Sequence, residues 1–176
     1  MNTELIKKTK WFWAWQDEQE ETWLSEMANE GLHLDKVTFP GSYQFKKGAS
    51  ANYIYRLDYQ SLKAKDRESY LQLFADSGWE LVGEMAGWMY FRFLPGEGKI
   101  PEIYSDTESK IEKYQRLILY LVVFLPIMVT VLPSILGRVG IFSSIADVLF
   151  ALLMLLYGFS MFSLVRRINE LKKNSN

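Results

Sequence analysis

The chain has 176 residues, of which 49% are hydrophobic and 23% are charged, and its net charge is -1. It contains no cysteine, which excludes thiolate metal sites and thiol nucleophiles. Residues 1–116 hold 15 Lys and Arg against 19 Asp and Glu, so the basic face on which phosphate binding depends is missing and we expect no direct nucleic-acid partner.

Residues 1–100 predict an α+β domain that contains an internal duplication. Apolar helix positions and the glycine that follows them recur at a constant offset of 47, as in Trp23 and Tyr70 or Gly31 and Gly78. Each glycine stands where a helix ends and the chain turns into a strand. We therefore expect two repeats, at about 11–48 and 53–95, each with the order strand, helix, strand, strand.

The strands are predicted from segments rich in aromatic and β-branched residues. Alternating Trp11, Trp13 and Trp15 predict the first of them. Two such repeats would form one antiparallel sheet of about six strands with two helices on one face. The predicted strands are 11–16, 32–38, 43–47, 53–59, 79–84 and 88–94.

Aromatic residues make up 15% of the chain and gather in these strands. One interpretation is that they form the core of a small domain. The other is that the sheet face away from the helices keeps an aromatic groove, in which charged side chains orient an apolar ligand or a peptide. The candidate binding residues for that groove are Arg56, Asp58, Trp88, Tyr90 and Arg92.

Catalytic motifs are not found, and we expect no enzyme activity, no cofactor and no metal site. His33 is the only histidine, and it lies on a predicted strand where it points to solvent. Glu18, Glu20 and Glu21 stand at a helix start, where acidic residues complement the helix dipole, so they are interpreted as surface residues. The segment 96–99 lacks the spacing of a phosphate-binding loop.

Residues 101–116 predict a linker helix in front of the apolar region. Ser105 and Glu108 have the spacing of a helix cap, and no helix breaker separates them from the apolar residues. Such a helix is either a spacer or an element that transmits movement.

Residues 117–165 predict a transmembrane hairpin, with spans at 117–136 and 145–164. A helix of twenty residues is about 30 Å long, which matches the hydrocarbon core of a bilayer. The only Asp, Glu, Lys or Arg in either span is Asp147, near the start of the second. Pro126 and Pro133 are expected to bend or shorten the first span. The alternative is a buried helical pair in a soluble protein.

Basic residues flank the predicted hairpin and predict its orientation. Seven of them lie next to the outer ends of the two spans, whereas the turn between the spans carries only Arg138. Both termini, including the basic tail 166–176, are therefore expected in the cytoplasm. Residues 1–16 contain no apolar run of the kind that a secretory signal needs. The seven residues are Lys110, Lys113, Arg116, Arg166, Arg167, Lys172 and Lys173.

Several linked motifs resemble the bacterial family known as domain of unknown function 2812, over about residues 8–116. One departure from the family pattern is Leu32, where tryptophan is commoner. The resemblance implies a Gram-positive-type membrane protein without an established active site, whose relatives are often encoded beside PadR-like transcriptional repressors. The motifs are Trp11-Phe12-Trp13-Ala14-Trp15, Trp23-Leu24-x-x-Met27-Ala28-x-x-Gly31-Leu32-x-Leu34, Tyr53-x-Tyr55-Arg56-Leu57-Asp58-Tyr59, Gly78-Trp79-Glu80 and Ile103-Tyr104-Ser105-Asp106-x-Glu108-Ser109-Lys110.

Three functions fit this sequence. The first is a regulatory or sensory module in the bacterial cell membrane, whose cytoplasmic domain binds a protein partner such as a PadR-like repressor. The second is a binding module that takes a small apolar ligand or lipid on the aromatic sheet face. The third is an accessory subunit of a transporter, which two almost wholly apolar spans make the least favoured.

Overall fold

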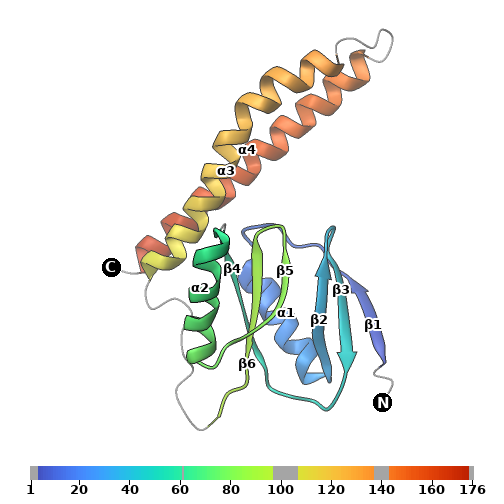
Figure 1. The fold of residues 1–176 in the computed structure, drawn as a ribbon. Helices are drawn as coiled ribbons and strands as arrows, with labels where there is room; N and C mark the ends of the chain where they lie inside the picture. The colour runs from blue at the N-terminus through green and yellow to red at the C-terminus, as the bar shows by residue number, and fades with distance from the viewer. Residues whose placement is uncertain (1–3, 61, 97–106, 137–142, 175–176) are drawn as a thin grey trace. The chain divides into compact units, whose positions relative to one another are not determined.

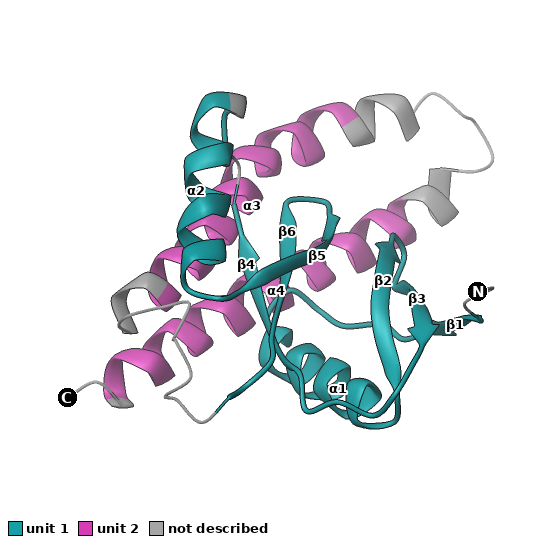
Figure 2. Ribbon diagram, turned by 60° about the horizontal axis from the view of Figure 1, so that its bottom comes forward, with its two compact units in different colours: residues 1–105 teal, residues 106–176 magenta. Residues whose placement is uncertain are grey.

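The computed structural model describes residues 4–60, 62–96, 107–136 and 143–174. The chain divides into two compact units, Met1–Ser105 and Asp106–Asn176, which are coloured separately in Figure 2. The predicted cap at Ser105 and the predicted turn around residues 137–140 lie outside the described residues. Each unit is described by itself below.

The first unit is an α+β domain that repeats one order of elements, as predicted (Figure 1). The two helices begin and end 47 residues apart, and the β-bulges at Leu34/Lys36 and Leu81/Gly83 are also 47 residues apart. The duplication thus includes the positions of the bulges as well as those of the helices. The elements are β1 (Leu5–Thr9), α1 (Asp17–Asn29), β2 (Leu32–Thr38), β3 (Ser42–Lys47), β4 (Ile54–Tyr59), α2 (Ala64–Asp76), β5 (Glu80–Met85) and β6 (Trp88–Phe93).

The six strands form two three-stranded antiparallel sheets, in the orders β1-β3-β2 and β4-β6-β5, and not the single sheet that we expected. Strands β2 and β5 lie side by side between the sheets (Figure 1), and a Cβ on Gly83 would come within 3.4 Å of Val37 Cγ1. Both of these strands carry a bulge. A bulge leaves a residue unpaired and increases the local twist, which accounts for the missing ladder between them.

The first strand lies before the predicted position. Residues Leu5–Thr9 form β1, with Ile6 opposite Phe45, whereas 11–16 form no strand. The alternating tryptophans pack on one another instead: Trp11 and Trp13 meet edge to face at 5.6 Å, and Trp13 stacks on Trp15 at 5.4 Å. The prediction of a strand over 11–16 was therefore wrong, because an aromatic cluster has the same alternating pattern.

The two helices pack on opposite faces of β6, not on one face. Tyr90 packs in the core that contains α1, while its neighbours Met89 and Phe91 pack against Phe74 of α2. Because successive strand residues point to opposite faces, β6 is covered on both sides. Helix α1 contacts the first sheet through residues such as Phe45, so it contributes to the packing of both repeats.

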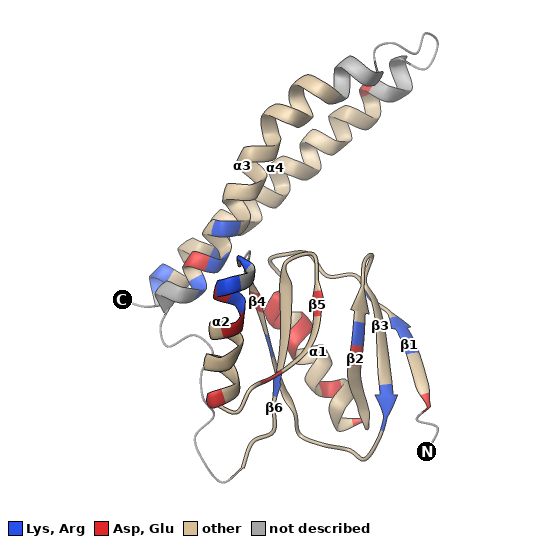
Figure 3. Cartoon of the chain, in the orientation of Figure 1, with Lys and Arg blue, Asp and Glu red and all other residues tan. Residues whose placement is uncertain are grey.

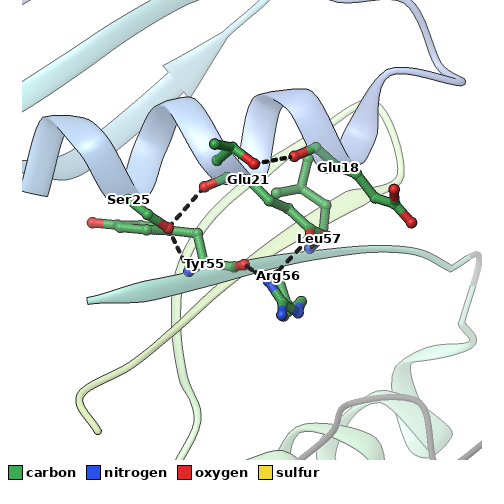
Figure 4. A network of polar contacts seen from close by, with 7 residues as sticks. Glu18, Glu21, Ser25, Tyr55, Arg56 and Leu57 are labelled. Carbon is green, nitrogen blue, oxygen red and sulfur yellow. Dashed lines mark hydrogen bonds and ion pairs between the residues drawn. The ribbon is translucent and has the colours of Figure 1, made fainter. Parts of the chain in front are cut away.

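Helix α1 also lies along the free edge of β4 (Figure 4). The backbone N–H of Leu57 donates to Glu21 Oε1 at 2.8 Å, and that of Tyr55 donates to Ser25 Oγ at 3.3 Å. Arg56 forms an ion pair with the other oxygen of Glu21, at 3.2 Å. These contacts satisfy edge groups that would otherwise be open to pairing with another chain.

The second unit consists of two long helices, α3 (Thr107–Leu136) and α4 (Ser143–Asn174), which pack against each other. Both are long and apolar enough to cross a membrane, and only 11% and 6% of the two candidate spans are buried in the structure. The core helix of a soluble protein would be mostly buried, so the soluble alternative is disfavoured. Figure 3 colours the charged residues of the chain, and in this unit they lie near the ends of the helices.

The linker and the tail that we predicted are parts of these helices. Residues 107–116 belong to α3, which runs on through Pro126 and Pro133 without an interruption, and α4 continues through the basic residues to Asn174. Near the charged end, Arg167 Nε of α4 donates to Tyr114 Oη of α3 at 3.5 Å.

Candidate functional site

The first unit contains a pocket of about 190 Å³. Its lining includes residues from the start of α1 and from both hairpin turns, which lie at the same end of this unit in Figure 1. Seven of its thirteen lining residues are aromatic, and both repeats contribute to it. The lining residues are Trp11, Phe12, Trp13, Ala14, Asp17, Glu20, Phe39, Gly41, Tyr43, Met85, Ala86, Trp88 and Tyr90.

One wall of the pocket is the segment between β1 and α1, which hydrogen bonds hold in place. Lys10 N–H donates to Gly41 O at 3.0 Å, and Trp13 N–H donates to Gln16 Oε1 at 3.0 Å. Gly41 has a φ of 68°, and a Cβ there would lie 2.5 Å from Lys10 O. Only glycine allows this close approach of the two backbones, so Gly41 fixes the position of the aromatic wall.

Two carboxylates from the first turn of α1 line the pocket. Asp17 is 2% exposed and Glu20 is 7% exposed, although helix starts usually keep acidic residues in water. Burial raises the pKa of Glu20, against the opposing effect of hydrogen bonding from tyrosine hydroxyls. The site thus holds acidic groups in an environment that penalises their charged form.

Two tyrosines from the sheets line the pocket near Glu20. Tyr43 Oη donates to Glu20 Oε1 at 2.7 Å. Tyr90 is fully buried, and its hydroxyl makes no hydrogen bond of normal geometry within the described chain. Burial, followed by the electrostatic effect of Glu20, raises the pKa of both tyrosines, so both stay neutral and able to donate.

The structure brings together only part of the predicted groove. Trp88 and Tyr90 line the pocket. Arg92 shares their strand face but forms a two-fold hydrogen bond with Glu80, at 2.8 and 2.9 Å, and lies over the ring of Tyr53.

The other two predicted residues, Arg56 and Asp58, lie on the opposite face of the second sheet, because they pair across β6 with Phe91 and Met89. Asp58 is buried, and it accepts a hydrogen bond from the Tyr70 hydroxyl of α2. The sheet face that carries Arg56 and Asp58 is therefore not the face that carries Trp88, Tyr90 and Arg92.

The interpretation of Glu18, Glu20 and Glu21 as surface residues holds only for Glu18. The other two are buried, one in the pocket and one on the edge of β4. The sequence contained a signal for this: Asp17, Glu20, Glu21 and Leu24 follow the three- and four-residue spacing of the buried face of α1. Acidic residues at the spacing of the apolar face of a helix therefore predict buried carboxyl groups, whereas a count of acidic residues at the helix start does not.

The structure gives no indication of a metal site in the part of the chain that it describes, where no group of three or more His, Asp or Glu side chains could hold an ion. His33 is partly buried, and its Nε2 lies 2.8 Å from Ala49 O. Its hydrogen bond is to the backbone of its own repeat, and it lies outside the pocket lining.

Comparisons with curated proteins and with solved structures found no match. Residues 16–126 match a family described as "Protein of unknown function (DUF2812)". The match covers most of the first unit and extends into α3, so it joins the α+β domain to the first apolar helix. The chain belongs to the DUF2812 family.

Proposed function

We propose that this protein is a membrane-anchored binding module whose pocket takes a small apolar ligand. The observation that carries the proposal is the pocket itself, in which Trp11 and Trp13 from one repeat and Trp88 from the other line a site that also holds buried polar groups. Apolar concave sites with a few polar groups are the usual form of ligand sites. Its volume of about 190 Å³ is below the roughly 300–1,000 Å³ of drug-sized pockets, so the ligand is small.

The helical hairpin serves as the membrane anchor in this proposal. Its long exposed apolar faces favour a bilayer, and the basic residues at its outer ends favour termini in the cytoplasm. The α+β domain then works at the cytoplasmic side of a bacterial cell membrane. A sensor placed there meets apolar compounds that partition into the bilayer.

Tryptophan fluorescence provides the test, because all six tryptophans precede residue 106 and report on the first unit alone. The full-length protein in nanodiscs is screened against small aromatic compounds for ligands that change the fluorescence and raise the melting temperature. Trp88→Ala should abolish the effect, whereas the control Leu73→Ala, on the exposed face of α2, should keep it. A screen with no saturable effect on the wild-type chain would refute the proposal.

A second candidate function, binding of a protein partner, is favoured by an exposed aromatic pair at the pocket. Phe39 is 69% exposed and Trp11 is 50% exposed, and their rings meet at 6.0 Å. Exposed aromatic residues are enriched at protein interfaces. A PadR-like repressor encoded nearby is the partner that the family resemblance suggests.

That candidate is tested by co-purifying the full-length protein with the neighbouring repressor in mild detergent. The double variant Trp11→Ala/Phe39→Ala should lose the repressor, while Leu73→Ala should retain it. Equal recovery with all three proteins would exclude this surface. The transporter role stays a prediction, and measured solute flux in proteoliposomes would be needed to favour it.

A further inference from the structure

We infer that the ligand of this pocket is an organic cation, a small ammonium compound with an apolar body, for which Glu20 provides the counter-charge. The inference rests on the proposed function, because it names the class of compound that the same pocket takes.

The charges of the pocket lining all have one sign. Asp17 and Glu20 are the only charged side chains among the lining residues that the structure describes, and both are buried. Glu20 accepts a hydrogen bond from the neutral Tyr43 hydroxyl, and a buried carboxylate costs free energy that proteins usually offset by pairing or protonating it. A ligand that brings its own positive charge would remove this cost.

The walls of the pocket suit the rest of such a ligand. Trp11, Trp13 and Trp88 offer aromatic rings, and a cation over an aromatic ring is attracted by its quadrupole, most strongly for tryptophan. Lys10 already makes this contact from outside the lining, since its Nζ lies 5.0 Å from the Phe12 ring centroid and 4.9 Å from that of Trp23. The aromatic wall is thus able to hold a cation.

The unsatisfied hydroxyl of Tyr90 is the second polar feature that points to a ligand. It is buried in the pocket and makes no hydrogen bond of normal geometry, although it is close enough to Glu20 to oppose the rise in the pKa of that carboxyl, whereas the equivalent hydroxyl of Tyr43 donates to Glu20. A polar atom that is buried without a well-formed hydrogen bond costs free energy. The Tyr90 hydroxyl is therefore available to accept a bond from an ammonium N–H or to meet a polar group of the ligand.

An inorganic cation fits the pocket less well. Magnesium and calcium are surrounded by several oxygen ligands, which come from the protein or from bound water. Two carboxylates among aromatic rings give too few oxygens, and the described residues contain no cluster able to hold a metal.

The experiment compares 3-hydroxyphenyltrimethylammonium with its neutral isostere 3-tert-butylphenol, which replaces the charged nitrogen with carbon. Binding to the full-length protein in nanodiscs is followed by tryptophan fluorescence, with empty nanodiscs to correct for partitioning into lipid. The wild-type chain should bind the cation about tenfold more tightly than the isostere or better. Glu20→Gln should remove that preference, since the amide keeps the acceptor for Tyr43 but loses the charge.

Glu21→Gln is the matched control. Glu21 is as buried as Glu20 and is its neighbour on α1, but it faces Arg56 and the edge of β4 and does not line the pocket. This variant should keep the preference for the cation. Tyr90→Phe should bind the cation more weakly without reversing the preference.

The pH dependence provides an independent measurement. The groups that face Glu20 are Asp17 on its own helix, Tyr43 on β3 and Tyr90 on β6. Because burial raises the pKa of Glu20, affinity for the cation should fall on acidification while affinity for the isostere stays level. The fall should be absent from Glu20→Gln.

Three outcomes are distinguishable. Equal binding of both compounds, unchanged in Glu20→Gln, would overturn the cation inference but support the proposed function. Loss of the preference in Glu21→Gln as much as in Glu20→Gln would overturn the assignment of the charge to Glu20. Failure of both compounds to bind at millimolar concentration would contradict the inference and the proposed function together.

Discussion

Glu20 is a buried carboxyl group whose charged form is penalised by the fold, which is a common property of residues at functional sites. Its carboxylate is buried beside Asp17, and burial and this neighbour both raise its pKa while Tyr43 and Tyr90 oppose them. The folded protein therefore holds this proton more tightly than the unfolded chain does. Groups with pKa values shifted by burial are concentrated at functional sites.

The first prediction concerns the effect of Glu20 on stability. Because its folded-state pKa is raised, the unfolded chain releases its proton first as the pH rises above 4.5, the ordinary pKa. The folded state then loses stability until the pH passes the raised pKa. Thermal unfolding of Glu20→Gln, followed by tryptophan fluorescence, should thus show an advantage over wild type that grows with pH and then levels off. A constant difference across this range would show that Glu20 is not desolvated.

Ala86 gives the second prediction, which concerns backbone strain next to the pocket. It has a φ of 50° in the two-residue turn between β5 and β6, and Gly87 follows with a φ of 88°. A non-glycine residue pays about 1–2 kcal/mol for this conformation, and glycine loses about 0.5–1 kcal/mol more in chain entropy. Ala86→Gly should therefore stabilise the first unit by about 0.5–1 kcal/mol, measured from the same fluorescence transition. A lower melting temperature would contradict this reasoning.

Helix α1 contacts more parts of the first unit than α2 does. It packs in a core with residues of both sheets, provides the carboxylates of the pocket and covers the free edge of β4. Its equivalent α2 packs against its own sheet through the smaller cluster around Phe74. We therefore expect α1 to unfold with the whole unit and α2 to open more readily.

The edge contacts of α1 provide the third prediction. Glu21→Ala removes an acceptor from the buried N–H of Leu57 and the partner of Arg56. A hydrogen bond to a charged group contributes about 1.5–3 kcal/mol, so we expect a loss of that size in the free energy of unfolding of the first unit. Glu18→Ala on the exposed face of α1 is the control and should change it by less than about 0.5 kcal/mol. Equal losses in both variants would indicate a general effect on the helix.

The sequence allowed the repeat and its helices to be predicted because the signals are local. Gly31 and Gly78 both have a positive φ, and they follow helices whose apolar positions recur at one offset. The division into two sheets was not predictable, since it depends on how β2 and β5, which are far apart in the chain, meet in space, and each of them is twisted by a bulge in its ladder with the next strand. The first strand was predicted at the wrong position because the alternating tryptophans of 11–15 resemble a strand more closely than the residues of β1 do.

The pocket was predictable only in part, for a related reason. Trp88 and Tyr90 were identified from strand alternation, which is local. Their neighbours Asp17, Glu20 and Phe39 come from the other repeat, and the tertiary fold alone brings them together. Arg56 was assigned to the same site because the register of β4 on β6, which decides its face, cannot be read from one strand.

The whole protein combines an α+β domain with two long apolar helices, and the orientation of these helices in a membrane is the fourth prediction. The chain lacks cysteine, so a single introduced cysteine can be labelled without background. Glu68→Cys, exposed on α2, should react with a membrane-impermeant maleimide only after cell lysis. Asp147→Cys, near the start of α4, should react in intact cells. The reverse pattern would invert the orientation, and labelling of both in intact cells would exclude a hairpin that crosses the membrane.

The difference between the two repeats has a consequence for the symmetry of the pocket. The offset of 47 places Ala64 and Arg67 at the positions equivalent to Asp17 and Glu20, so the second repeat has a carboxylate at neither position. Two identical copies of one repeat could build only a site with two identical halves. Because both repeats lie in one chain, each half can differ, and one supplies Asp17 and Glu20 while the other supplies Trp88 and Tyr90.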